Sequence, residues 1–272
     1  MRTTGIHHDD NKGVDRLMYA EERQHEIVTR ARDLGRVSVA ELASRFEVTP
    51  ETIRRDLDAL SGRGLLRRVH GGAVPAEKLR LTEAPVGTRD TSSTEEKLAI
   101  ALRAVGLLPR REGLTVLVDA GTTTARLCPI LPQWIGLVVT NSVPTAAALS
   151  SRGDLEVLLL GGQVRGITQA TVGSEALDML GRLRVDVAFV GTNGFSAEHG
   201  FSTPDPTEAA VKRAMVRSAR EVMVLADSSK LGVDHLVRFA TLDDVDILVT
   251  DPSVPSGGAA ELRDAGLRVE LA

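Results

Sequence analysis

The sequence predicts an α/β protein in two parts: a small helical N-terminal module and a larger domain built on a mostly parallel sheet. Its 272 residues allow one large domain or two smaller ones. Residues 75–93 are polar and broken by prolines, which is typical of a linker. Before them the pattern is helical, and after them helical stretches alternate with short runs of apolar β-formers. We therefore expect domains at residues 19–74 and 94–272, preceded by a disordered polar tail at 1–18.

The composition excludes several classes of protein and site. Hydrophobic residues make up 42% and charged residues 26%, which is globular composition with enough apolar material for a sizeable core. No apolar run approaches the ~18 residues that cross a membrane, and the N-terminus has no apolar signal core, so we expect a cytoplasmic protein without a membrane partner. The single cysteine, Cys128, excludes an internal disulfide. The six histidines lack ligand spacing, so no metal or cofactor is expected.

The charge differs between the two parts. Residues 19–80 hold 12 Lys and Arg against 10 Asp and Glu, whereas residues 81–272 hold 18 against 24. A mildly basic module on an acidic body fits a DNA reader with a separate sensing domain. Many ordinary two-domain proteins show the same difference, so the motifs must decide.

Two helices are predicted at the start of the N-terminal module. Residues 21–34 have helical periodicity, and Gly35 ends it. After a short extended link, Ser38 and Glu41 form a capping box, in which the serine hydroxyl caps the helix and the glutamate reaches back. This second helix runs to about Phe46.

A third helix and a hairpin complete the module. Thr49 is a good N-cap and Pro50 suits the first helical position, so a helix is predicted over 50–61. Residues 65–74 alternate loosely around two glycines, which predicts a short β-hairpin. The order helix, tight turn, helix and hairpin is that of a winged helix-turn-helix, a DNA-binding motif.

The third helix has the properties of a recognition helix. Its apolar positions recur at i, i+4 and i+7 and face the core: Ile53, Leu57 and Leu60. Thr52, Arg54 and Arg55 then point outward near the helix N-terminus, where such a helix meets base edges. Arginine pairs bidentately with guanine, and threonine contacts a thymine methyl or a phosphate. The alternative is an ordinary solvated helix face. The residues predicted to contact DNA are Ser38, Thr49, Thr52, Arg54, Arg55, Arg67, Arg68 and His70.

The larger domain predicts a parallel sheet between layers of helices. Nearly continuous Val, Leu and Ile runs indicate strands that are buried on both faces. The predicted strands cover residues 115–119, 137–140, 155–160, 185–190, 221–225 and 247–250. The predicted helices cover residues 94–107, 122–131, 143–151, 174–181, 206–219 and 259–265.

Polar and glycine-rich loops follow successive predicted strands and meet at one edge of the sheet, where open α/β sheets bind ligands. The most distinctive loop is DAGTTT at 119–124, whose backbone N–H groups and hydroxyls suit an anion. An ordinary strand-to-helix turn is the alternative. Glu208 and Lys212 lie one helical turn apart, either at the site or as a surface pair. Lys212 and Lys230 are the candidate cations, whereas Arg165 stands alone and is interpreted as structural or solvated.

The N-terminal motifs resemble those of the DeoR/GlpR family of bacterial transcription regulators. They are the ER opening, V-x-ELA, TIRRDL, G-L-x-R and HGGA, spread over about 50 residues. The family usually has serine where Thr49 stands, a change that keeps the hydroxyl cap. The larger domain is also similar to this family, in the segments DAGTTT, VVTNS, LLGGQVR, DVAFVGTNGF, GFSTPDPTEAAVKRAM and LADSSKLG. The resemblance implies a sensor domain related in fold to ribose-5-phosphate isomerase and glucosamine-6-phosphate deaminase.

The resemblance also implies a function. The protein is expected to be a repressor of a sugar catabolic operon that leaves double-stranded operator DNA when a phosphorylated sugar binds the sensor domain. The sequence of residues 194–215 most resembles that of fructose-type and other sugar-operon regulators. A homodimer or homotetramer is expected, because specific affinity usually needs two or more half-sites. The effector-binding residues implied are Asp119, Gly121, Thr122, Thr123, Asn141, Gly162, Glu208, Lys212, Asp227 and Lys230.

A sugar-phosphate isomerase or deaminase is the alternative class. Moving a proton between adjacent carbons needs a positioned general base. The matching loop at 191–195 reads GTNGF and has no acid, although Glu208 and Asp227 remain candidates. We therefore assign no catalytic residue. A pure scaffold leaves the polar loops unexplained.

Overall fold

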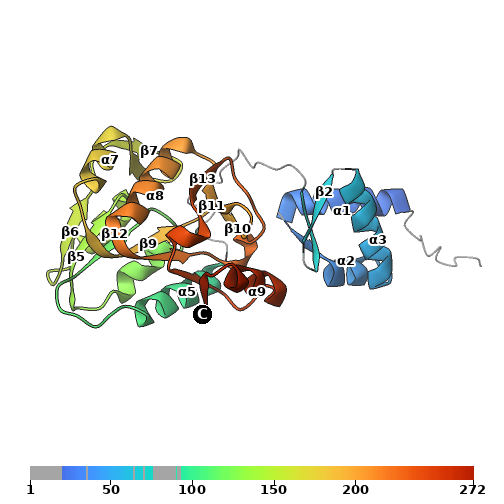
Figure 1. Ribbon diagram of the computed structural model, residues 1–272, viewed down its shortest axis with the longest axis horizontal. Coiled ribbons are helices and arrows are strands. Elements are labelled where there is room, and N and C mark those ends of the chain that lie inside the picture. Colours follow the sequence, from blue (N-terminus) through green and yellow to red (C-terminus); the bar gives the residue numbers. More distant parts are fainter. Residues whose placement is uncertain (1–19, 35, 64, 70, 76–89, 91–92) are drawn as a thin grey trace, which may run out of the picture.

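The computed structural model describes residues 20–34, 36–63, 65–69, 71–75, 90 and 93–272. The predicted tail at 1–18 lies outside these residues, as does nearly all of the predicted linker at 75–93. Figure 1 shows a small helical unit, coloured blue, and a larger α/β body, coloured green to red.

The small unit is a winged helix-turn-helix, as predicted. Its helices are α1 (Ala20–Leu34), α2 (Val39–Arg45) and α3 (Pro50–Gly62). Its strands are β1 (Val37–Ser38), β2 (Leu66–Val69) and β3 (Gly72–Pro75), which form an antiparallel sheet in the order β1-β3-β2. Strands β2 and β3 are the wing.

Both predicted caps of the helix pair are present. The Ser38 hydroxyl accepts a hydrogen bond from the Glu41 N–H at 3.2 Å and donates to the Glu41 carboxylate at 2.9 Å. The Thr49 hydroxyl accepts from the Thr52 N–H at 3.2 Å. These side chains satisfy N–H groups that have no partner within the helix, so the sequence itself fixes where α2 and α3 begin.

A buried ion pair ties α1 to α3. Arg23 Nε lies 2.6 Å from Asp56 Oδ2, and Gln24 Nε2 donates to Asp56 Oδ1 at 2.7 Å. Asp56 and Arg23 are 5% and 8% exposed, so solvent screens their attraction little. This pair helps to hold the orientation in which α3 presents its outer face.

The body is built on a seven-stranded sheet in the order β15-β14-β12-β9-β4-β5-β6, with every neighbouring pair parallel. Its strands are β4 (Leu114–Val118), β5 (Ile135–Thr140), β6 (Glu156–Leu159), β9 (Val185–Gly191), β12 (Ala219–Leu225), β14 (Ile247–Thr250) and β15 (Arg268–Leu271). The predicted parallel sheet is thus confirmed, and β15 is a strand that the sequence pattern did not reveal.

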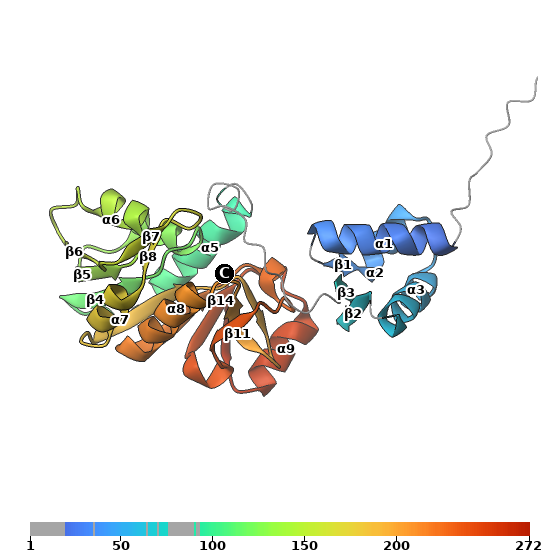
Figure 2. The same cartoon turned by 90° about the horizontal axis from the view of Figure 1, so that it is seen from above.

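Helices cover both faces of the sheet (Figure 2). One layer holds α5 (Thr94–Gly106), the 3-10 helix η1 (Thr124–Ile130) and α6 (Val143–Leu149). The other holds α7 (Ser174–Leu180), α8 (Pro206–Ser218) and α9 (Ser256–Asp264). Strand residues alternate between the two cores: Ala188 and Val190 of β9 face the α8 side, whereas Val187 and Phe189 face the α5 side.

Short elements make up the rest of the body. Strands β10 (Gly194–Ser196), β11 (Gly200–Thr203) and β13 (Val237–Ala240) form a small antiparallel sheet. Strands β7 (Gln163–Arg165) and β8 (Ala170–Val172) form an antiparallel hairpin. Two further 3-10 turns are η2 (Ser228–Lys230) and η3 (Leu242–Asp244). All five of these strands were missed, because they are short and lack the continuous Val, Leu and Ile runs that marked the equally short β6 and β14.

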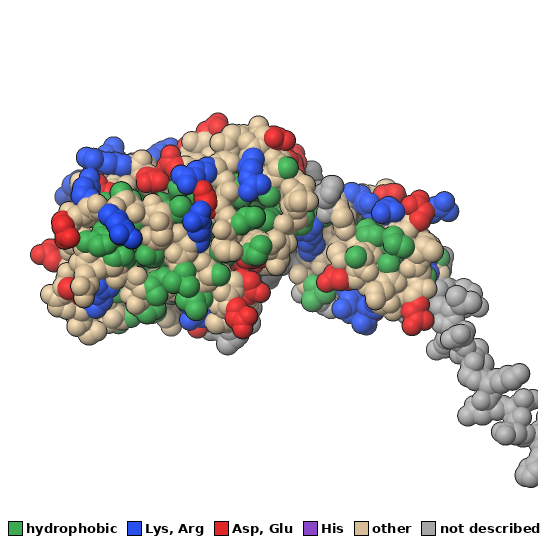
Figure 3. Space-filling model, turned by 90° about the horizontal axis from the view of Figure 1, so that it is seen from below, with side chains coloured by type: hydrophobic (Ala, Val, Ile, Leu, Met, Phe, Trp, Pro, Cys, Tyr) green, Lys and Arg blue, Asp and Glu red, His purple; other side chains and the backbone are tan. Residues whose placement is uncertain are grey.

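Within the described residues, no helix is long and apolar enough to span a bilayer. On the face shown in Figure 3, acidic and basic side chains alternate over the body with hydrophobic patches between them. On this face, the excess acidic side chains of the body do not form a single patch.

Candidate functional site

A polar cavity opens at the carboxyl ends of the central strands β4, β9 and β12, the place predicted for a ligand. It receives side chains from α5, the loop after β4, the loop after β9, α8 and η2. The residues that line it are Lys97, Ala120, Gly121, Thr122, Thr123, Gly191, Thr192, Asn193, Glu208, Lys212, Leu225, Ala226, Asp227 and Lys230.

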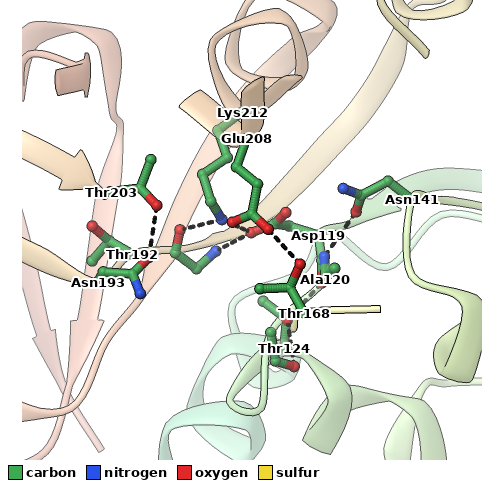
Figure 4. Close-up of polar contacts among 12 residues, drawn as sticks. Asp119, Ala120, Thr124, Asn141, Thr168, Thr192, Asn193, Thr203, Glu208 and Lys212 are labelled. Atoms are coloured by element: carbon green, nitrogen blue, oxygen red, sulfur yellow. Dashed lines mark hydrogen bonds and ion pairs between the residues drawn. The ribbon is translucent and has the colours of Figure 1, made fainter. Parts of the chain in front are cut away.

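Hydrogen bonds from the side chains of Thr124 and Asn141 help to hold the loop after β4 in shape. The Thr124 hydroxyl donates to the Asp119 carbonyl at 2.6 Å, which closes the turn on itself. Asn141 Oδ1, at the end of β5, accepts from the Ala120 N–H at 2.8 Å (Figure 4). Asn141 is buried and therefore acts behind the cavity, by fixing the loop that carries Gly121 and Thr122.

Lys212 is engaged in a buried ion pair with Asp119. Its Nζ contacts Asp119 Oδ2 and donates to the Gly191 carbonyl at 2.9 Å (Figure 4). The Gly191 N–H in turn donates to Asp119 Oδ2 at 3.0 Å. Burial raises the pKa of the Asp119 carboxyl, and the Lys212 ammonium opposes that rise. The Lys212 charge is thus balanced within the protein, which leaves less of it for an anionic ligand.

Glu208 is held by the β7–β8 hairpin and not by Lys212. Its Oε1 accepts from Arg165 Nη1 at 2.7 Å and from the Thr168 hydroxyl. Glu208 and Lys212 are 6% and 4% exposed, so the alternative of a surface i, i+4 pair is wrong. Each of these two ions has its own partner from a different part of the chain.

Two further lysines line the cavity. Lys230, which was predicted from the sequence, is the last residue of η2. Asp227 caps the start of η2, and its carboxylate accepts a hydrogen bond from the Ser229 N–H at 3.1 Å. Lys97 of α5 was missed. It is 3% exposed, and burial lowers the pKa of its ammonium, with Asp227 opposing and Lys230 adding to that change. Its helical register was the available signal, because position 97 shares a face with the buried Ile100, Ala101 and Ala104.

Most of the predicted effector residues come together. Seven line the cavity: Gly121, Thr122, Thr123, Glu208, Lys212, Asp227 and Lys230. Asp119 and Asn141 lie behind it and bond to lining residues. Gly162 lies elsewhere, at the start of the β7–β8 hairpin with φ +123°, where a Cβ would come within 2.4 Å of the Val172 carbonyl oxygen. Its glycine is therefore explained by the backbone. Roles in ligand binding stay predictions for all ten residues.

The outer face of α3 presents the two arginines predicted to contact DNA. The side chains of Arg54 and Arg55 are 54% and 82% exposed. Both approach Glu51 one turn earlier, with Arg54 Nη1 at 3.3 Å and Arg55 Nε at 3.8 Å from its carboxylate oxygens. These exposed pairs are weak and leave the guanidinium groups available.

The other predicted DNA contacts differ in their surroundings. The hydroxyls of Ser38 and Thr49 serve as helix caps, and Thr52 Oγ1 lies 2.9 Å from Thr49 Oγ1. Arg68 Nε lies 3.3 Å from Asp58 Oδ1, which ties the wing to α3. The side chain of Arg67 and the whole of His70 lie outside the described part of the chain. Contact with DNA stays a prediction for all of them.

In the part of the chain that the structure describes, no group of three His, Cys, Asp or Glu residues is placed to hold a metal ion. A DNA-reading fold joined to a domain with its own polar cavity is the organisation of a transcription regulator with a built-in sensor.

Comparison with known proteins agrees with that class. The family model described as the DeoR C terminal sensor domain matches residues 92–252, and the DeoR-like helix-turn-helix domain matches residues 23–78. The HTH-type transcriptional regulator GlpR of Haloferax volcanii is 40% identical over 93% of this chain and 98% of its own length. The glycerol-3-phosphate regulon repressor of Escherichia coli is 32% identical over 92% and 98%. This chain belongs to the DeoR family of transcriptional regulators.

Among solved structures, ribose 5 phosphate isomerase A from Neisseria gonorrhoeae aligns with 52% of this chain and 55% of its own. The identity is 17% and the TM-score 0.38.

Proposed function

We propose that this protein represses a sugar catabolic operon and leaves its operator when a phosphorylated sugar binds the cavity at the carboxyl ends of β4, β9 and β12. The observation that carries the proposal is that Lys97, Lys230 and the hydroxyl-rich loop at 121–123 line the same cavity. The name of the E. coli relative, a glycerol-3-phosphate regulon repressor, supports a phosphorylated effector.

The two lysines supply the charge that a phosphate dianion needs. We assign Lys97 and Lys230 to the phosphate because both side chains line the cavity together with the loop at 121–123. Burial lowers the pKa of the Lys97 ammonium, and a bound anion would favour its charged form. Backbone N–H groups and hydroxyls of Thr122 and Thr123 would bind the remaining phosphate oxygens.

We propose no catalytic activity. The loop at 191–195 has no carboxylate, and Glu208 is engaged by Arg165 and Thr168. The Asp227 carboxylate accepts from the Ser229 N–H and hydroxyl at the start of η2. These contacts support a binding site over a site of proton transfer, for which a base must reach the substrate.

Repression and release follow from linkage. A winged helix-turn-helix reads a short half-site, so we infer a homodimer or homotetramer that holds two or more such units on the operator. A sugar phosphate that favours a different arrangement of these units would lower operator affinity. By reciprocity, operator DNA would lower sugar-phosphate affinity by the same factor.

The test is fluorescence anisotropy with DNA from the protein's own upstream region at fixed salt. We expect tight, specific binding that is released by fructose 1-phosphate, fructose 6-phosphate or glycerol 3-phosphate. Specific binding that none of them releases would contradict the proposed effector. The absence of specific binding at every salt concentration would contradict the regulator, and the same compounds would then be assayed for isomerisation.

Replacing Lys97 with methionine should weaken binding of the releasing sugar phosphate by about tenfold or more. Methionine keeps the buried stem of the side chain and removes the charge, and a charge-assisted bond contributes about 1.5–3 kcal/mol. Isothermal titration calorimetry measures the effect, and Arg110→Met, at an exposed position of the body, is the charge-matched control. Equal affinity of the wild type and Lys97→Met for the sugar phosphate would show that the Lys97 charge does not contribute to binding.

A further inference from the structure

The β7–β8 hairpin is bonded to the cavity wall through one arginine and one threonine. Arg165 Nη1 donates to Glu208 Oε1 at 2.7 Å, and the Thr168 hydroxyl donates to the same oxygen. Arg165 Nε also lies 3.3 Å from Asp205 Oδ2, at the N-cap of α8. The pKa of the Asp205 carboxyl lies below its ordinary value. Burial alone would raise this pKa, but hydrogen bonds from Thr207 and Glu208 and the charge of Arg165 outweigh that effect.

Glu208 lines the cavity, whereas Arg165 and Thr168 are not among the residues that line it. Both hairpin contacts fall on Oε1, so they fix the carboxylate from one side. A carboxylate that is 6% exposed needs such hydrogen-bond partners in place of water, and these partners also fix its orientation. Arg165 therefore acts on the cavity through Glu208.

The same hairpin is also connected to a second part of the cavity wall, the loop after β4. Its second strand is bonded to the end of β5, where the Thr171 N–H donates to the Asn141 carbonyl at 2.7 Å. The Asn141 side chain holds the Ala120 N–H of the loop after β4. One hairpin thus sets the position of the loop assigned to the phosphate and the position of the Glu208 carboxylate.

We propose that Arg165 is a positioning residue for ligand selection: it holds Glu208 as an acceptor for the hydroxyl groups of the ligand, so that the hairpin distinguishes a phosphorylated polyol from phosphate alone. This inference rests on the proposed function of the cavity. An ionised carboxylate only accepts hydrogen bonds, which matches hydroxyl donors and disfavours a second anionic group. Fixing the acceptor in advance lowers the entropy lost on binding.

The test compares three ligands by calorimetry: inorganic phosphate, glycerol 3-phosphate and fructose 1-phosphate. In the wild type we expect at least one of the two organic phosphates to bind more tightly than inorganic phosphate. Arg165→Ala should reduce that preference by about tenfold or more, because Glu208 loses its charged partner. Its affinity for inorganic phosphate should stay within about threefold, since the cations assigned to phosphate are unchanged. Arg165→Lys should restore part of the preference.

Two further variants separate positioning from folding. Thr168→Val removes one bond to Glu208 Oε1 and keeps the Arg165 charge, so a smaller loss of preference is expected even if Arg165→Ala does not fold. Arg182→Ala, at an exposed position of the body, is the matched control and should change nothing. Hydrogen exchange of residues 163–172 gives a second readout, and the hairpin should exchange more slowly when the organic phosphate is bound.

The possible results test the role of the hairpin separately from the proposed binding of a phosphorylated sugar. A wild-type protein that binds neither organic phosphate more tightly than inorganic phosphate contradicts the proposed function itself. A wild-type preference that survives in both Arg165→Ala and Thr168→Val overturns only the role of the hairpin. Equal losses of phosphate and organic phosphate binding would show a general structural role and overturn it as well.

Discussion

Replacing Arg54 and Arg55 together with alanine should lower operator affinity by about 100-fold or more and leave sugar-phosphate binding unchanged. Both guanidinium groups are exposed on the outer face of α3, and a base-reading arginine contributes about 1–3 kcal/mol. The core face of the helix, with Ile53 and Leu57 fully buried, is untouched by the change. The unit should therefore stay folded while its reading surface is lost.

Anisotropy titrations at two salt concentrations check this result, because arginines on phosphate and arginines on bases respond differently to salt. The matched control is Arg110→Ala with Arg182→Ala, which removes the same charge from exposed positions of the body. An equal loss in the control would show that net charge and not α3 determines affinity. Unchanged operator binding in the α3 variant would refute the assignment of the recognition helix.

Replacing Lys212 with methionine should destabilise the body by about 3–5 kcal/mol at pH 7, the cost of leaving one member of a buried ion pair without its partner. The remaining member is Asp119, which is 1% exposed and directly follows β4. The single tryptophan, Trp134, lies in the body, so its fluorescence follows unfolding of this domain in urea.

The loss should depend on pH in a defined direction. Burial already raises the pKa of Asp119 in the folded protein, and removal of Lys212 takes away the charge that opposes this rise. A group with a raised folded-state pKa favours folding when it is protonated, so the deficit should shrink as pH falls toward the ordinary range of an aspartate and grow as pH rises. Asp119→Asn combined with Lys212→Met should recover much of the stability. A deficit that is equal at every pH would contradict this account.

The sequence predicted the parts of the fold whose signals are local. Ser38 and Thr49 marked the starts of two helices because a cap bonds to N–H groups only three residues away. The buried strands were recognised by their Val, Leu and Ile runs. Strands such as β10 and β13 were missed because they are short and lack such a run, and β13 pairs with β11 across the intervening α8 and β12.

The site was predictable at the level of loops but not of pairs. The carboxyl ends of parallel strands placed the polar loops together before any side chain was located. The partner of Glu208, however, is Arg165, 43 residues earlier, and the partner of Lys212 is Asp119, 93 residues earlier. Such pairs depend on how α8 packs on the sheet, and no spacing rule in the sequence reports that.

The position of Glu51 has a consequence for how the protein searches a genome. Its carboxylate is within 4 Å of both arginines of α3, so each guanidinium has an internal partner before DNA arrives. On random sequence, an arginine that moves to a backbone phosphate loses one weak pair as it gains another. A guanine edge offers two directed bonds instead. If Arg54 and Arg55 read bases as predicted, Glu51 would bias both guanidinium groups by a small amount against backbone phosphates, which favours short stays on the vast excess of wrong sites.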